Sequence, residues 1–309
     1  HIHTVQVIAN NDYMAPAVIR LGEGETVEIS FDHLTHDYHR YQYVLTHCNA
    51  DWTPSDLSET EYLDGFNDNP IEDHDISVNT TLPYTHYRLT FPNDQVRPKL
   101  SGNYRLLVYD DAEGKNKPAF STCFRILEKE VNISAQVSSD TEIDRNKNHQ
   151  QVSFSIQHKG YPIRNPQNEI RVHVLQDNRT DNEVTNLQPS YVGPDQLRYE
   201  HNRALIFPAG NEYRRFEMVS TRYASQGVES IRYHAPYYHV TLQPDLPRLL
   251  NYSYDQDQNG RFVIRYDEAV DNNTEADYFF VHFSLLWANP LREGKFYLQG
   301  AFTYDDFNE

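Results

Sequence analysis

Alternation of apolar and polar residues is the feature of this sequence that most restricts its fold. In the first part of the chain, short runs place apolar side chains at every second position, the spacing at which side chains share one face of a β-strand. These runs are 4–9, 17–21, 25–31, 41–48, 86–91, 104–110 and 120–127. Turn-rich segments separate them, a pattern typical of a Greek-key sandwich. We therefore predict an all-β fold of tandem immunoglobulin-like β-sandwich domains.

The runs divide the chain into three predicted domains. The first is 1–129, and the second, 130–245, contains runs at 131–137, 151–157, 170–176, 204–210, 214–220 and 235–243. A proline-containing linker follows. The remaining 246–309 begins a third β domain, in which we expect 278–287 to pair with 295–302. Because so short a piece rarely completes a core, we expect this domain to be truncated.

A long connection, 49–84, interrupts the strands of the first domain. Connections of this length usually have structure or function of their own. We expect one helical turn that starts at Ser55, which resembles an N-cap. Trp52, Tyr62 and Phe66 are the large apolar residues of the connection. They either fold back to cap the open end of the sandwich or form a contact surface for a partner protein.

The two cysteines, Cys48 and Cys123, both lie in predicted strands of the first domain. In an oxidising compartment one sandwich can join such a pair in a disulfide. The alternative is two separate buried thiols that behave as small apolar residues. The sequence leaves both alternatives open, because it does not give the Cα separation that a disulfide requires.

Motifs for catalysis and metal binding are weak. His33, His36 and His39 recur at three-residue spacing beside aspartates, which makes them weak candidates for zinc ligands. The chain has 15 histidines, however, so solvated loop histidines explain the cluster equally well. The sequence contains neither a nucleophile-elbow motif nor a glycine-rich phosphate loop. We predict no enzymatic activity, no cofactor and no metal.

The net charge of −18 restricts the partners of the chain. A nucleic-acid-binding protein needs cationic side chains to displace phosphate counterions, and an anionic lipid surface attracts basic segments. We therefore expect no nucleic acid or membrane-surface partner. The sequence also lacks an apolar stretch long enough for a transmembrane helix, and no signal peptide opens it. We expect a monomer when the protein is isolated.

Longer motifs run through all three predicted domains. They are 15–32, 43–66, 84–94, 101–109, 172–192, 203–218, 259–269 and 275–285. The most specific is CNADWTPSDL, 48–57, since a generic sandwich does not produce that order of residues. Together these motifs resemble those of the type IX secretion system plug proteins of Bacteroidetes.

The resemblance implies a non-enzymatic, periplasmic protein associated with the outer membrane. Its partner would be a giant outer-membrane β-barrel translocon, which it keeps shut from the periplasmic side, or another envelope protein. The resemblance brings no catalytic or cofactor residues. The residues alone suggest an alternative, a carbohydrate-binding module of a cell-envelope glycan system, because the 23 tyrosines on sandwich faces offer rings that stack on sugars.

Overall fold

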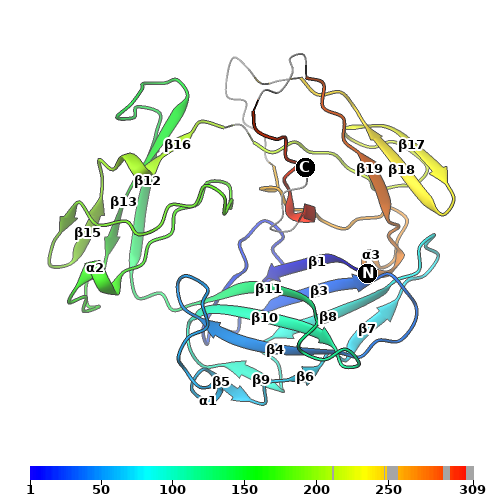
Figure 1. Cartoon of the computed structure of the whole chain (residues 1–309), viewed down its shortest axis with the longest axis horizontal. Coiled ribbons are helices and arrows are strands. Elements are labelled where there is room, and N and C mark those ends of the chain that lie inside the picture. The colour runs from blue at the N-terminus through cyan, green and yellow to red at the C-terminus, as the bar shows by residue number, and fades with distance from the viewer. Residues whose placement is uncertain (211, 247, 249–256, 288–292, 304–309) are drawn as a thin grey trace. The chain divides into compact units, whose positions relative to one another are not determined.

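The computed structural model describes residues 1–210, 212–246, 248, 257–287 and 293–303 (Figure 1). Strands hold 39% of the residues and helices 6%, which confirms the predicted all-β, multi-domain sandwich class. Contacts divide the chain into two compact units. One contains 1–127 and parts of 214–247 and 260–309, and the other contains 128–213 and part of 248–259. The three-domain division and its immunoglobulin-like assignment stay predictions.

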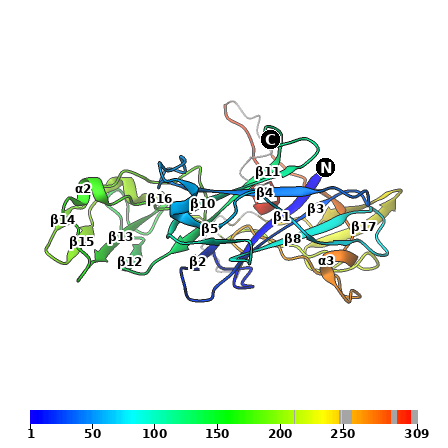
Figure 2. The same cartoon turned by 90° about the horizontal axis from the view of Figure 1, so that it is seen from below.

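Residues 1–127 of the first unit form a sandwich built on two larger sheets, called here the first sandwich (Figure 2). One has the order β1 (Ile2–Ala9), β3 (Val27–His33), β8 (Thr85–Phe91) and β7 (Asp73–Ile76). The other has the order β2 (Val18–Arg20), β11 (Pro118–Leu127), β10 (Gly102–Asp110), β4 (Tyr41–Cys48) and β6 (Asn69–Pro70). All seven runs predicted for this region are strands. Apart from β2, which pairs in parallel with β11, neighbouring strands in these sheets are antiparallel.

Aromatic rings fill the core between these sheets. Phe31 is 1% exposed and stacks on Tyr87, with ring centroids 5.0 Å apart. Tyr41 and Phe120 contact it edge-on at 5.1 and 4.9 Å. The tyrosines bury their rings while their hydroxyls find acceptors at the margin, as Tyr87 does by donating to the His39 carbonyl at 3.0 Å. A buried phenol needs a hydrogen-bond partner, and the margin of this core supplies one. The core can therefore contain many tyrosines.

The 49–84 connection has structure of its own. It contains α1 (Glu59–Tyr62), β5 (Leu63–Gly65), which pairs with β9 (Val96–Pro98), and the strands β6 and β7. The helical turn is present, but its predicted N-cap is wrong. Ser58 caps it, and its backbone N–H donates to the Glu61 carboxylate at 2.7 Å. Ser55 instead donates its N–H to the carbonyl of His47 at 2.9 Å, which keeps it beside β4.

The first unit also contains a smaller sheet of β17 (Val228–His234), β18 (Tyr237–Leu242) and β19 (Phe279–His282). The predicted pairing of 278–287 with 295–302 is wrong. Its strand β19 pairs in parallel with β18, which places Val281 beside the buried Val240. The run at 214–220 is not a strand either. Short helices α3 (Asn272–Glu275) and η2 (Ala301–Thr303) complete the described elements of this unit.

The second unit has one sheet with the order β12 (Asn132–Ser138), β13 (His149–Gln157), β15 (Gln196–Tyr199) and β14 (Tyr191–Val192), and β16 (Ile206–Pro208) also pairs with β13. Two short helices, α2 (Pro166–Glu169) and η1 (Arg203–Leu205), lie in its connections. The predicted strand at 170–176 is absent. The segment 170–176 instead makes a single β-bridge, between Val174 and Val184, and its valines pack on the small core of the sheet.

Candidate functional site

The CNADWTPSDL segment forms a tight turn against the outer face of the β2-β11-β10-β4-β6 sheet. Its central residue, Trp52, has a backbone φ of 64°, a left-handed conformation that is uncommon for a bulky side chain. Two arginines hold it there. Arg105 of β10 donates to the Trp52 carbonyl at 2.5 Å, and the Arg125 guanidinium of β11 lies 5.0 Å from the centre of the indole. The sheet therefore supports a strained residue, as binding sites often do.

Tyr62 and Phe66 have opposite environments. Tyr62 is 4% exposed, belongs to the main core and donates its hydroxyl to the Leu45 carbonyl at 3.3 Å. Phe66, four residues later, is 85% exposed. The two interpretations of the connection thus apply to different residues: Tyr62 caps the core, whereas Phe66 projects from it.

Gly65 fixes where Phe66 leaves the sheet. Its φ is 101°, and a Cβ at this position would lie 2.0 Å from the backbone oxygen of Gln95. Only glycine allows so close an approach between β5 and the chain that leads into β9. The next N–H, that of Phe66, donates to the same Gln95 oxygen at 3.2 Å. The exposed ring is therefore attached to a firmly bonded backbone.

The predicted histidine cluster has protein partners. His39 bonds to the Asp110 carboxylate at 2.6 Å, and His36 bonds to the Ser77 hydroxyl at 2.9 Å. His33 is buried, and its Nδ1 lies 3.2 Å from the Tyr41 hydroxyl. In the described part of the chain, no three His, Cys, Asp or Glu side chains are arranged to hold one metal ion. Whether these three histidines bind a metal stays a prediction.

The two cysteines are too far apart for a disulfide. Cys48 pairs with Asn103 of β10, and Cys123 pairs with Arg105 on the other side of the same strand. With β10 between them, their Cα atoms are separated by about 10 Å, against the 7 Å limit of a disulfide. This topology favours separate thiols. Cys48 is buried beneath the Trp52 turn, whereas Cys123 is exposed.

We expect the two thiols to react at very different rates. Burial raises the pKa of the Cys48 thiol, which leaves less thiolate for reaction at neutral pH. Iodoacetamide should therefore modify the exposed Cys123 at least about tenfold faster than Cys48. Mass spectrometry of peptides after timed labelling measures both rates. Equal rates, or protection of both thiols that reduction removes, would contradict this assignment.

A buried polar network forms on the opposite sheet. Asp32 of β3 and His86 of β8 are 3% and 1% exposed, and His86 Nδ1 lies 2.6 Å from Asp32 Oδ1. The other carboxylate oxygen, Oδ2, accepts from the Tyr278 hydroxyl at 2.5 Å. The same hydroxyl contacts Thr4 Oγ1, also at 2.5 Å. Burial and the Asp32 charge raise the pKa of Tyr278, so the phenol stays a donor.

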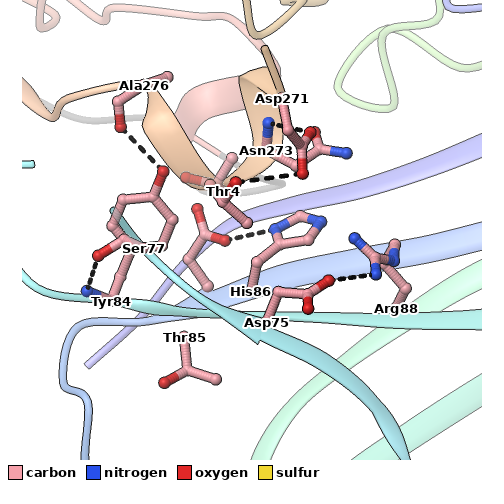
Figure 3. A network of polar contacts seen from close by, with 12 residues as sticks. Thr4, Asp75, Ser77, Tyr84, Thr85, His86, Arg88, Asp271, Asn273 and Ala276 are labelled. Atoms are coloured by element: carbon pink, nitrogen blue, oxygen red, sulfur yellow. Dashed lines mark hydrogen bonds and ion pairs between the residues drawn. The ribbon is translucent and has the colours of Figure 1, made fainter. Parts of the chain in front are cut away.

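Neighbouring contacts hold the segment that carries Tyr278. Tyr84 donates its hydroxyl to the carbonyl of Ala276 at 2.9 Å, a contact that Figure 3 shows in close-up. The backbone N–H and the hydroxyl of Thr81 both donate to Asp277 Oδ1, each at 2.7 Å. The segment 276–278 is therefore bonded to the first sandwich. Sequence reasoning missed this site, since no local pattern links residues so far apart along the chain.

The Asp32–His86 pair resembles two members of a catalytic triad, but it lacks the third. In a triad the second imidazole nitrogen accepts the proton of a nucleophile. His86 Nε2 is buried and has no hydrogen-bond partner among the described residues. The Tyr278 hydroxyl occupies the remaining Asp32 oxygen rather than approaching that nitrogen. The arrangement fastens a segment, and within the described ranges no nucleophile is hydrogen-bonded to His86 Nε2.

Comparison with known proteins identifies the first sandwich. Residues 2–128, which contain β1 to β11 and the Trp52 turn, match the family model of the type 9 secretion system plug protein 1st domain. Residues 2–128 of the chain belong to the type IX secretion plug protein family. A type IX secretion-related role follows, and the plug family is a non-enzymatic secretion component.

Solved structures add one close relative of this plug family member. A hypothetical protein from Parabacteroides merdae ATCC 43184 is 48% identical, with a TM-score of 0.95 over 100% of this chain and 77% of that chain. Another match is Pseudomonas fluorescens alkylpurine DNA glycosylase AlkC bound to DNA containing an abasic site analog. It has 13% identity and a TM-score of 0.23 over 41% of this chain and 30% of that chain, which is too low to indicate a common fold. No curated protein matches the chain. In its described residues, no helix is long and apolar enough to cross a membrane.

Proposed function

We propose that this chain is a non-enzymatic, periplasmic interaction protein that closes the periplasmic side of the type IX outer-membrane translocon. The observation that carries the proposal is the plug-domain match over residues 2–128, which contains both Trp52 and Phe66. In this proposal the two side chains, together with the backbone that holds them, form part of the surface that contacts the barrel or another envelope protein.

The chemistry of these residues supports a protein contact. Phe66 is 85% exposed, so its ring contributes little to the stability of the isolated chain. Covering the ring with a partner removes apolar surface from water, which makes the free energy of binding more favourable. Tryptophan and arginine are the residue types most enriched among binding hot spots, and here Arg125 lies over the Trp52 ring. Because the turn is already bonded to β10 and β11, little conformational freedom remains to be lost on binding.

Replacing Phe66 with alanine should weaken the contact without harming the fold. We expect F66A to reduce co-purification of the protein with outer-membrane translocon components about tenfold, in cells that have the secretion system. Quantitative mass spectrometry of the purified complex measures the loss. The melting temperature should remain within about 1 °C of wild type, because an exposed side chain contributes little to stability.

Tyr161→Ala is the matched control. Tyr161 is an aromatic residue of the second unit, outside the plug domain, and is 45% exposed. This variant should co-purify like wild type. Equal recovery of F66A and Y161A would exclude Phe66 from the contact. A wild-type protein that co-purifies with no envelope component would overturn the proposed function itself.

The carbohydrate-binding alternative needs a row of rings that present their faces to a sugar. Among the described residues, the exposed rings of Phe283 and Phe302 stack on each other at 11°. The Phe280 and His239 rings also stack, at 20°, and His282 meets His239 through a nitrogen–nitrogen contact of 2.9 Å. These rings turn their faces or edges to one another, an arrangement that does not favour sugar binding.

A further inference from the structure

Three histidines lie on one face of the small β17-β18-β19 sheet, in which β19 runs beside β18 (Figure 1). His239 of β18 is directly opposite Phe280, and His282 follows two residues later on β19. Since residues two apart share a face, His239 and His282 are diagonal neighbours. His234 of β17 contacts His239 from the other side, with ring centroids 5.4 Å apart. His234 and His282 are exposed, and His239 is half-buried.

Two nitrogen atoms of this group converge. His239 Nδ1 and His282 Nε2 are 2.9 Å apart, and the two ring planes are within 15° of each other, with centroids 5.2 Å apart. A neutral imidazole has one N–H and one lone pair, so a single proton between these nitrogens satisfies both. When a metal ion replaces that proton, the two rings tilt so that both lone pairs point at the ion.

We propose that His239 and His282 form a binding site for a late first-row divalent metal ion, with Cu²⁺ or Ni²⁺ as the best fit. Imidazole nitrogens bind such ions at about 2.05 Å, so two of them at right angles are about 2.9 Å apart, as cis positions of tetragonal or octahedral coordination require. A tetrahedral angle separates them by about 3.35 Å. The present spacing therefore matches cis coordination by Cu²⁺ or Ni²⁺. Because ring centroids 5.2 Å apart place the two imidazoles nearly in line, each ring has to tilt by about 45° before its lone pair points at the ion.

The surroundings set the strength of the site. The described residues supply two imidazoles at bonding distance, so water completes the coordination unless His234 rotates inward as a third ligand. Arg232 is paired with His239 across β17 and β18, and its positive charge opposes a cation on this face. Cu²⁺ should consequently bind more tightly than Ni²⁺ or Zn²⁺, following the usual order of affinity for nitrogen ligands. An ion here would join β18 to β19, two strands from distant parts of the chain.

Titration of the intact chain with Cu²⁺ tests the proposal. Because the chain has 15 histidines, the decisive quantity is a difference between variants. We expect H239Q and H282Q each to lose one equivalent of bound Cu²⁺, or to weaken its binding at least about tenfold. The electron paramagnetic resonance signal of that equivalent should show two coordinated imidazole nitrogens in the wild type. Cu²⁺ should also raise the wild-type melting temperature, because an ion that binds only the folded state stabilises it.

His201→Gln is the control, since the His201 side chain in the second unit is 89% exposed. It should bind Cu²⁺ like wild type. H234Q separates the two versions of the site: loss of affinity identifies a third ligand, and unchanged affinity identifies a two-histidine site. The circular dichroism spectra of the variants establish that each is folded. If H239Q and H282Q bind as many equivalents as wild type with the same thermal shift, or if wild type binds none, the proposal is wrong.

Discussion

Replacing Phe31 with alanine is expected to lower the free energy of unfolding of the first unit by about 3–5 kcal/mol. Phe31 is 1% exposed, and its ring contacts those of Tyr41, Tyr87 and Phe120. Alanine removes the buried area and leaves a cavity among rings that are themselves held by strands on both sheets. Urea denaturation monitored by tryptophan fluorescence gives the change, because Trp52 lies in the same unit.

Phe31→Leu is the control for Phe31→Ala. Leucine keeps most of the volume and apolar surface, so its cost should be below about 2 kcal/mol. A loss under about 1 kcal/mol for the alanine variant would show that the site collapses freely, which is incompatible with a closely packed aromatic core.

Asp32→Ala should cost a similar amount, about 3–5 kcal/mol, for a different reason. The substitution removes the acceptor of two buried donors, His86 Nδ1 and the Tyr278 hydroxyl. Each unsatisfied buried donor costs about 1–3 kcal/mol. Urea denaturation again measures the change. Tyr278→Phe removes only one donor and should cost about 1–2 kcal/mol.

A double-mutant cycle separates the network from ordinary packing. Once Asp32 is alanine, the Tyr278 hydroxyl keeps only its contact with Thr4 Oγ1, so the Y278F substitution should cost less than it does in the wild type. The interaction free energy should exceed about 1 kcal/mol. Additive effects of D32A and Y278F would show that this hydrogen bond does not fasten the segment to the sandwich.

The sequence predicted the first sandwich well because one physical pattern decides it. Strands such as β4 and β10 have one face in the aromatic core, so their apolar residues alternate with a period of two. The same pattern misled at 170–176, whose valines pack on the core of the second unit without pairing in a ladder. It also misled at 214–220, where Phe216 contacts the ring of Phe283. Conversely, β15 was missed because it is only four residues long, although its buried Leu197 and Tyr199 alternate with polar residues. Alternation reports burial, whereas a strand also needs a bonded neighbour.

The candidate site was predicted only where it is local. The composition of CNADWTPSDL marked the turn, and Trp52 and Phe66 stood out as large apolar residues in a polar connection. The opposite environments of Tyr62 and Phe66 were not predictable, because they depend on the turn at Gly65 and on its contact with Gln95. The arginines that hold Trp52 come from β10 and β11, more than 50 residues later in the chain. Side chains from such distant positions leave no pattern in a sequence window.

The bond between Asp32 and Tyr278 spans 246 positions, and the whole second unit lies between them in the chain. During synthesis the first sandwich therefore leaves the ribosome long before its last partner exists. At about 5–20 residues per second, Asp32 and His86 wait on the order of ten seconds or more for Tyr278. In that interval the sheet has to remain folded with a buried charge that lacks one of its donors. A nascent chain arrested before residue 276 should therefore be more sensitive to protease than one arrested well after residue 278, although both contain all the strands of the first sandwich.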